Sequence, residues 1–369
     1  MNKYKTRREL SKVAPYSLGM TEKDLKEKYQ LQSIIRMSDN ESVYGCSPSV
    51  KEAINNQLSS IHFYPDGNTT HIIEKLSSFY EVDSKQFIIS NGSEEIIRLL
   101  ARAFISKGDE AVMADITFPR YETNILLEGG TAVKVPLVDG VHNLSAMDRA
   151  ISGKTRMVFV CNPNNPTGTT VNSKELLEFI DGVPDDVLVV IDEAYYEYVN
   201  GDYLQTVPLL KQYPNLVILR TFSKIYGLAG LRVGYGIMNK GIVDALHKVK
   251  DVFNVNQLAQ VAAASALSDQ AFIQECAKKN HTEIEFVQKQ LGEIGVDSFP
   301  SETNFLFCYS SHPISQKLLE YGIVVRQMKL TGYEDAFRVT VGTREDNEQF
   351  LKAVKEIVSE RTVENGLKA

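Results

Sequence analysis

Short apolar runs alternate with helix-like stretches through the middle of the chain. Five runs rich in β-branched residues predict strands, namely Gln86–Ser90, Glu110–Asp115, Met157–Cys161, Val187–Asp192 and Leu216–Arg220. These runs are almost entirely apolar, which is typical of strands that helices cover on both faces of a parallel sheet. From Ile96 to Phe104, apolar residues recur along one face of a helix. The pattern therefore predicts an α/β domain with a mostly parallel central sheet flanked by helices.

The pattern changes after about residue 245. Helical periods run through Leu258–Leu267 and Ala271–Ile294, and Phe350 to Val358 form the apolar face of a last helix. Three shorter strands are expected between them, at Thr303–Cys308, Gly322–Arg326 and Ala336–Val341. We therefore expect a large domain over residues 46–245 and a smaller α+β domain over residues 246–369. Residues 1–45 offer few strands and are expected to be an arm that contributes to the small domain and to the substrate pocket.

Composition adds limits to this outline. The 369 residues, 43% of them hydrophobic, exceed what one ordinary core holds and favour two domains. The formal charge is 40 − 47 = −7, which disfavours a nucleic-acid partner. The four cysteines show no paired or metal-binding spacing, so no metal site is predicted and a reducing compartment is favoured. No signal peptide and no apolar run of ~20 residues can be read, so we expect a cytoplasmic protein without a membrane span.

Polar motifs follow the predicted strands where the chain leaves the sheet, at the edge where open parallel sheets bind ligands. Asn91-Gly92-Ser93-Glu94 opens the first helix and offers free N–H groups for an anion, or an ordinary helix cap by Ser93. The loop 162–168, Asn-Pro-Asn-Asn-Pro-Thr-Gly, is either a rigid turn or a polar wall of a binding site.

Two further motifs carry charged groups. Asp192, followed by Glu-Ala-Tyr, ends an apolar strand. A carboxylate in this place is partly buried and stays charged only beside a cation. The alternative is an ordinary carboxylate that caps a helix. Lys224 follows Thr221 and Ser223 and precedes a glycine-rich stretch that contains Arg232. The glycines follow this lysine, so the spacing excludes a phosphate-binding P-loop.

The chain resembles the fold-type I aminotransferases, which use pyridoxal 5'-phosphate. The resemblance is carried by three motifs that occur in the order found in that family: the loop 162–168, the Asp-Glu-Ala-Tyr strand end and the segment 223–235. The resemblance covers nearly the whole chain. It implies that Lys224 holds the cofactor as a Schiff base and moves a proton, and that Asp192 pairs with the pyridine nitrogen. It also implies that Tyr195 and Asn165 contact the phenolic oxygen of the cofactor and that Phe118 stacks on its ring.

The same resemblance indicates which residues bind the cofactor phosphate. Backbone amides of Ser93 and Glu94, with the side chains of Thr221, Ser223 and Arg232, are expected to hold it. Tyr64 matches the tyrosine that reaches the phosphate from the partner subunit. The resemblance therefore implies a homodimer with a shared active site.

Within the family, the chain is most similar to the histidinol-phosphate aminotransferases, in the segment 40–48, around Tyr64, and at Arg326 and 337–345. The similarity implies that Arg326 and Arg338 bind the anionic end of the substrate, and that Tyr16 and Asn165 complete the substrate site. The implied reaction moves an amino group between glutamate/2-oxoglutarate and imidazole-acetol phosphate/L-histidinol phosphate, in histidine biosynthesis.

Two segments depart from the subgroup. Pro15-Tyr16-Ser17-Leu18-Gly19 lacks the second proline of the usual P-Y-x-P-G, and residues 40–43 read Asn-Glu-Ser-Val where N-E-N-P is usual. An aromatic amino-acid aminotransferase and a decarboxylase of the threonine-phosphate type therefore remain alternatives. A non-catalytic, cofactor-binding regulator is a third, but it predicts a basic DNA-binding module that this sequence lacks.

Overall fold

The computed structural model describes residues 4–366 except 16–18, 329, 331 and 334. Its strands are β1 Ile35–Met37, β2 Phe87–Ser90, β3 Glu110–Ala114, β4 Thr131–Val135, β5 Thr155–Cys161, β6 Leu188–Asp192, β7 Leu216–Thr221, β8 Gly234–Met238, β9 Asp297–Ser298, β10 Phe305–Tyr309, β11 Ile323–Gln327 and β12 Phe337–Thr340. Its α-helices are α1 Glu22–Tyr29, α2 Pro48–Gln57, α3 Thr70–Tyr80, α4 Ser93–Phe104, α5 Arg120–Leu127, α6 Leu144–Arg149, α7 Ser173–Gly182, α8 Lys240–His247, α9 Gln257–Ser268, α10 Gln270–Ile294, α11 Ile314–Lys317 and α12 Arg344–Gly366.

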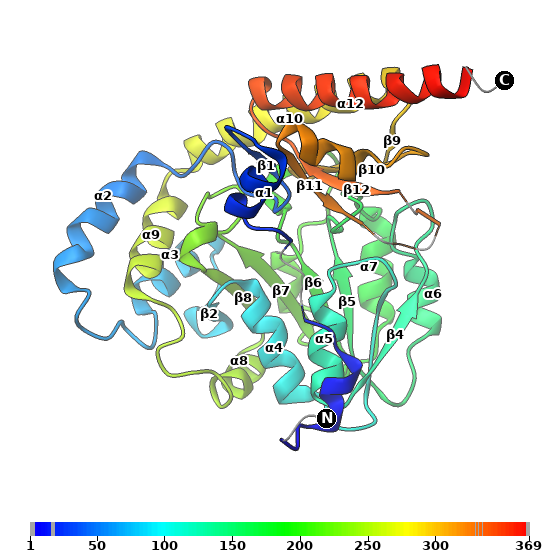
Figure 1. Cartoon of the computed structure of the whole chain (residues 1–369). Helices are drawn as coiled ribbons and strands as arrows, with labels where there is room; N and C mark the ends of the chain where they lie inside the picture. The colour runs from blue at the N-terminus through cyan, green and yellow to red at the C-terminus, as the bar shows by residue number, and fades with distance from the viewer. Residues whose placement is uncertain (1–3, 16–18, 329, 331, 334, 367–369) are drawn as a thin grey trace.

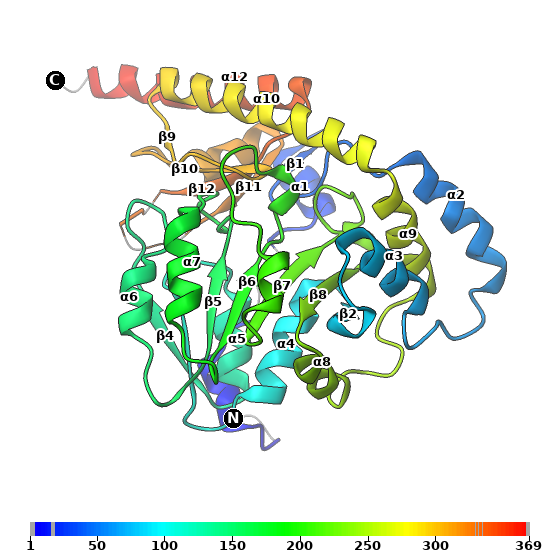
Figure 2. The same ribbon diagram turned by 180° about the vertical axis from the view of Figure 1, so that it is seen from behind.

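The larger sheet has the strand order β2-β8-β7-β6-β5-β3-β4 and is parallel except for β8. Side chains along each strand alternate between two apolar cores, as the pleat requires. On β6, Val189 and Ile191 enter one core while Leu188 and Val190 enter the other. Helices α4, α5 and α8 pack on one face, and α3, α6, α7 and α9 on the other (Figures 1 and 2). This confirms the expected α/β architecture and explains why the strand runs are apolar throughout.

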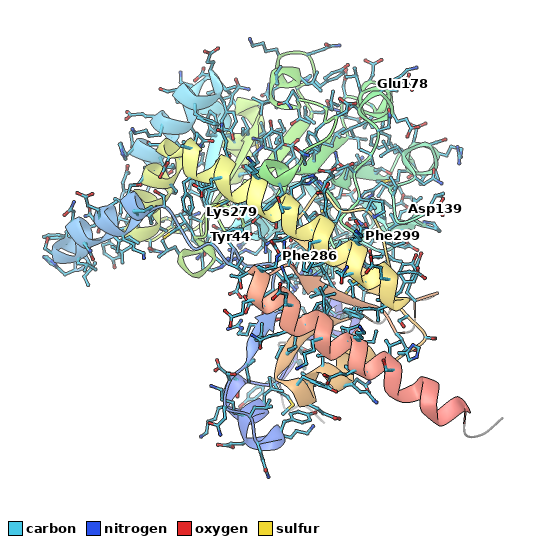
Figure 3. All side chains as sticks on the ribbon, turned by 90° about the horizontal axis from the view of Figure 1, so that it is seen from above. Tyr44, Asp139, Glu178, Lys279, Phe286 and Phe299 are labelled. Atoms are coloured by element: carbon cyan, nitrogen blue, oxygen red, sulfur yellow. The ribbon has the colours of Figure 1, made fainter. Side chains whose placement is uncertain are left out.

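The smaller sheet has the order β1-β11-β12-β10-β9 and carries a third apolar core under α10 and α12. Strand β1 comes from the N-terminal segment and pairs in parallel with β11. Figure 3 shows α10 and α12 side by side, with Lys279 of α10 near Tyr44, whose ring centroid lies 5.8 Å from the lysine nitrogen. Domain boundaries at residues 45 and 245 stay a prediction. No helix in the described part of the chain has the length and apolar character that a bilayer crossing requires.

Four strands were not expected from the pattern: β1, β4, β8 and β9. Strand β8 matters for the site, because it lies inside the glycine-rich stretch after Lys224. A Cβ on Gly234 would lie 2.5 Å from the backbone nitrogen of Ser93, and one on Gly236 would meet Ile96 and Met238. Glycine at these positions therefore lets β8 run directly beneath the start of α4.

Candidate active site

A cavity of about 390 Å³ opens at the carboxyl ends of β5, β6 and β7, where the small sheet faces the large one. Its walls come from both sheets and from the segment before α2. The lining residues are Asp39, Asn40, Gly92, Ser93, Glu94, Thr117, Phe118, Pro119, Cys161, Asn165, Pro166, Asp192, Ala194, Tyr195, Thr221, Ser223, Lys224, Arg232, Arg326, Gln327, Met328, Leu330 and Arg338.

One end of the cavity is built to hold an anion. Ser93 is the first residue of α4, so it does not cap the helix, and Gly92 before it leaves the first turn without a side-chain cap. A Cβ on Gly92 would lie 2.6 Å from Nη2 of Arg232, so glycine there makes room for the guanidinium. Arg232 also donates through Nη1 to Ser223 Oγ at 3.3 Å. Free N–H groups, a helix dipole and a guanidinium thus converge beside Thr221 and Ser223.

The carboxylate of Asp192 lies on the cavity wall at the end of β6 and is 4% exposed. Its Oδ1 accepts from the Ala194 backbone N–H at 3.2 Å, and its Oδ2 accepts from the Tyr121 hydroxyl at 2.6 Å. Burial raises the pKa of Asp192 to about 6, against the lowering effect of these hydrogen bonds. A group placed in the cavity with a cationic N–H would favour the charged carboxylate.

The amine of Lys224 projects from the loop after β7. Its Nζ donates to the backbone oxygen of Asp39 at 3.2 Å. Burial, followed by the charge of Arg338, lowers the pKa of Lys224 to about 8. About a tenth of the amine is then uncharged at pH 7, and the uncharged form is the one that a nucleophile or a proton acceptor requires.

Two polar side chains of the cavity wall, Tyr195 and Asn165, form hydrogen bonds that connect the parts of the chain on either side of the cavity. The Tyr195 hydroxyl accepts a hydrogen bond from Asn40 Nδ2 at 2.9 Å, and burial raises the pKa of Tyr195. The Asn165 Oδ1 accepts from Arg338 Nη1 at 2.6 Å. Since Asn165 and Tyr195 follow the large sheet and Arg338 lies on β12, the site is assembled only when both sheets are in place.

Two arginines enter the cavity from the small sheet. Arg326 and Arg338 are direct register partners on the antiparallel strands β11 and β12. Arg338 Nη2 also donates to the backbone oxygen of Ser38 at 2.7 Å, which fixes the direction of its guanidinium. With Lys224 and Arg232, four cationic side chains among the described residues line the cavity. Guanidinium groups bind both carboxylates and phosphates, so the cavity suits a ligand with more than one anionic group.

The structure brings most residues expected at the site together. Those that line the cavity are Ser93, Glu94, Phe118, Asn165, Asp192, Tyr195, Thr221, Ser223, Lys224, Arg232, Arg326 and Arg338. Tyr64 lies outside it, 81% exposed, with its ring stacked on Phe253 at 4.6 Å. Tyr16 lies outside the described residues. Within the described part of the chain, no group of three or more His, Cys, Asp or Glu side chains is arranged to hold a metal ion.

Among the residues that the sequence did not assign to the site, Asn40 and Tyr121 form hydrogen bonds to side chains that line the cavity. Asn40 is 1% exposed and bonds to Tyr195, 155 positions away. Tyr121 is fully buried and bonds to Asp192, 71 positions away. Asn40 at least lies in a segment that resembles the subgroup, whereas no local pattern distinguishes Tyr121 from an ordinary core tyrosine.

Comparison with known proteins gives matches over nearly the whole chain. The family model "Aminotransferase class I and II" matches residues 32–354. The histidinol-phosphate aminotransferase of Geobacillus sp. (strain WCH70) is 45% identical over 357 residues, which are 96% of this chain and 98% of that protein. The enzyme of the same name from Geobacillus thermodenitrificans (strain NG80-2) is 46% identical, with 96% and 98% covered.

Solved structures share this fold. One of them is the crystal structure of histidinol-phosphate aminotransferase from Sinorhizobium meliloti in complex with pyridoxal-5'-phosphate, with a TM-score of 0.90 and 24% identity. The match covers 97% of this chain and 98% of that one. At this identity the likeness shows the fold alone.

Proposed function

The chain belongs to the class I and II aminotransferases, and we propose that it uses pyridoxal 5'-phosphate to move an amino group between glutamate/2-oxoglutarate and imidazole-acetol phosphate/L-histidinol phosphate. One observation carries the proposal: a single cavity holds an amine of lowered pKa, a buried carboxylate and a register pair of arginines, Arg326 and Arg338. The substrate follows the relatives that match along nearly the whole chain. The pathway served would be histidine biosynthesis.

The anion site fits the cofactor phosphate. The first backbone amides of α4, at Ser93 and Glu94, have no side-chain cap and would donate to phosphate oxygens. Arg232 would supply a bidentate guanidinium beside the hydroxyls of Thr221 and Ser223. The missing Cβ at residue 92 keeps this space open, as the close approach of Arg232 shows.

The remaining walls fit the cofactor ring. Asp192 would pair with a protonated ring nitrogen, which relieves the cost of its buried charge. Tyr195 and Asn165 would hydrogen-bond the phenolic oxygen, and Phe118 would stack on the ring face. When bound, the cofactor supplies the electron sink that stabilises negative charge next to the transferred amino group.

Lys224 would hold the cofactor covalently and then carry the proton. Its amine is already oriented by the Asp39 carbonyl and is partly uncharged near neutral pH because of burial. An amine in this state accepts a proton from the substrate carbon and returns it on the other side of the transferred nitrogen.

The two arginines of the small sheet would select the substrates. Both the amino donor and the amino acceptor must present an anionic group opposite the reacting carbon, a carboxylate in glutamate and a phosphate in imidazole-acetol phosphate. Arg338, fixed by Ser38 and Asn165, would anchor one such group, and Arg326 beside it would add the second cation that a phosphate needs. That Tyr16 contributes to this pocket stays a prediction.

We also propose that the enzyme is a cytoplasmic homodimer with a shared active site. Apolar side chains exposed near Tyr64 support the dimer, including Ile61 at 61%, Phe63 at 66% and Val252 at 71% exposure. A surface of this kind is typical of an interface. Two-fold symmetry would let Tyr64 of each copy reach the phosphate site of the other. The four free cysteines suit a reducing compartment.

The shared site can be tested by subunit mixing. Tyr64→Ala and Lys224→Ala should each be nearly inactive, yet a mixed dimer keeps one site with both native residues. A random mixture would then regain about a quarter of wild-type activity. A mixture as inactive as its parents, with exchange proven by tagged subunits, would exclude a contribution of Tyr64 from the second copy.

The reaction itself is tested by comparing kcat/KM for histidinol phosphate and for phenylalanine, each with 2-oxoglutarate, by glutamate formation. A strong preference for histidinol phosphate is expected. A preference for phenylalanine would instead make the enzyme an aromatic aminotransferase. Release of carbon dioxide from a phosphorylated amino acid without 2-oxoglutarate would make it a decarboxylase.

A further inference from the structure

One buried hydroxyl next to the site has no part in the function proposed so far. We propose that Tyr121 is a positioning residue, which holds the carboxylate of Asp192 in its charged form and in the orientation that receives the cofactor ring nitrogen. The inference rests on the proposed function, because it assigns Asp192 to that nitrogen.

The tyrosine is held rigidly where it meets the carboxylate. Its side chain has 0% exposure, and its ring stacks on Phe159 with centroids 4.6 Å apart and planes 11° from parallel. Helix α5 carries it and packs on the sheet face that also bears Phe159 and Val190. The hydroxyl therefore has little freedom, and it donates to Asp192 Oδ2 at 2.6 Å, in the range of charge-assisted hydrogen bonds.

The bond favours the charged form of the carboxylate and restricts its direction. Tyr121 occupies one oxygen and the Ala194 N–H the other, so the carboxyl plane cannot rotate freely. A carboxylate oxygen accepts more than one hydrogen bond, so lone pairs remain available toward the cavity. Burial beside Asp192 raises the pKa of Tyr121, so it stays a donor. Its hydrogen bond is the largest influence that opposes the rise in the Asp192 pKa caused by burial.

A purely structural role has to be separated from this one, because Tyr121 also packs edge-on against Phe118, with centroids 5.6 Å apart. The change Tyr121→Phe keeps the ring and removes only the hydroxyl. Tyr235→Phe is the matched control, since Tyr235 is also 0% exposed and its hydroxyl bonds to Tyr80 instead.

The readout is the affinity of the cofactor-free protein for pyridoxal 5'-phosphate as a function of pH. Without the hydroxyl, Asp192 should protonate at higher pH, so the acid limb of the affinity profile should move up by about one pH unit, with about tenfold weaker binding near that limb. Tyr235→Phe should leave the limb in place. If Tyr121→Phe left the acid limb unmoved, the inference would be wrong.

A second comparison guards against an indirect effect. In an Asp192→Asn background no carboxylate remains to be tuned, so adding Tyr121→Phe should change affinity little and should not alter its pH dependence. A loss as large as in the native background would show that the hydroxyl acts through packing and would overturn the inference. A wild-type protein that fails to bind the cofactor at all would overturn the proposed function itself, which separates the two failures.

Discussion

The cofactor-free protein should become more stable when Asp192 is replaced by asparagine. Burial raises the pKa of this carboxyl from 3.8 to about 6 in the folded protein. At 1.36 kcal/mol per pH unit, the difference corresponds to about 3 kcal/mol. The folded state binds the proton more tightly than the unfolded one, so the charged carboxylate destabilises the fold. The penalty is complete above the folded pKa and vanishes below the unfolded pKa.

Asparagine removes the charge and can still accept the hydrogen bond from Tyr121. With an unfolding entropy of about 2.1 cal/mol/K per residue, a cooperative chain of this length should gain about 4 °C in Tm near pH 8. The gain should shrink to about half near pH 5, because the wild-type carboxyl is then largely protonated in the folded state. Asp186→Asn, the same change at an exposed aspartate, is the control.

Scanning calorimetry of both variants, with and without pyridoxal 5'-phosphate, tests the argument. The difference in Tm between Asp192→Asn and wild type should change sign when the cofactor is added, because the ring nitrogen then pairs with the charge of Asp192. Wild type should gain more from the cofactor than Asp192→Asn does. A lower Tm for the cofactor-free variant near pH 8, or a gain independent of pH, would refute the reasoning.

Three further changes address single contacts. Lys224→Ala should abolish transfer while leaving only noncovalent cofactor, measured by absorbance and by turnover, and sustained turnover would contradict its role. Arg326→Ala should lower kcat/KM by about ten- to hundredfold for histidinol phosphate and by less for phenylalanine. The control Arg156→Ala, at the surface, should change kcat/KM for neither substrate. Equal losses with both substrates would contradict the phosphate-binding role of Arg326. Glu193→Gln leaves the charge of Arg220 buried without its carboxylate partner and should cost about 3–5 kcal/mol by urea denaturation, so a loss well under 1 kcal/mol would count against this ion pair.

The sequence predicted the site largely because of one rule of parallel sheets. The apolar runs of β5, β6 and β7 are unmistakable, and their carboxyl ends lie side by side in the sheet. The polar residues after them, Asn165, Asp192 and Lys224, had to meet at one edge. The loop and the carboxylate were ambiguous when taken singly, whereas the shared edge and the family resemblance joined them with the lysine into one site.

Other features depend on packing that no local pattern encodes. Strand β8 was missed because Gly234 and Gly236 interrupt its apolar alternation, and the reason for both glycines lies in close contacts with α4 and other side chains. The bonds from Asn40 to Tyr195 and from Tyr121 to Asp192 join elements that become neighbours only when the chain is folded. The proposed role of Tyr64 needs a second copy of the chain, so it cannot be seen in the structure of a single copy.

The alternation of side chains at the ends of β6 and β7 also explains why a buried ion pair lies directly behind the cavity. Asp192 and Thr221 line the cavity, so the residue that follows β6 and the residue that precedes Thr221 on β7 point away from it. The side chains of these residues, Glu193 and Arg220, are 0% and 3% exposed and form an ion pair at 2.8 Å, and Thr206 donates to the other carboxylate oxygen at 2.7 Å. Each strand end thus gives one side chain to the cavity and one to a buried clamp behind it. This ion pair joins the ends of the same two strands that carry the cofactor contacts. Breaking it with Glu193→Gln should therefore weaken cofactor binding as well as lower the stability. A loss of stability alone would mean that the backbone hydrogen bonds between the strands suffice to hold the strand ends.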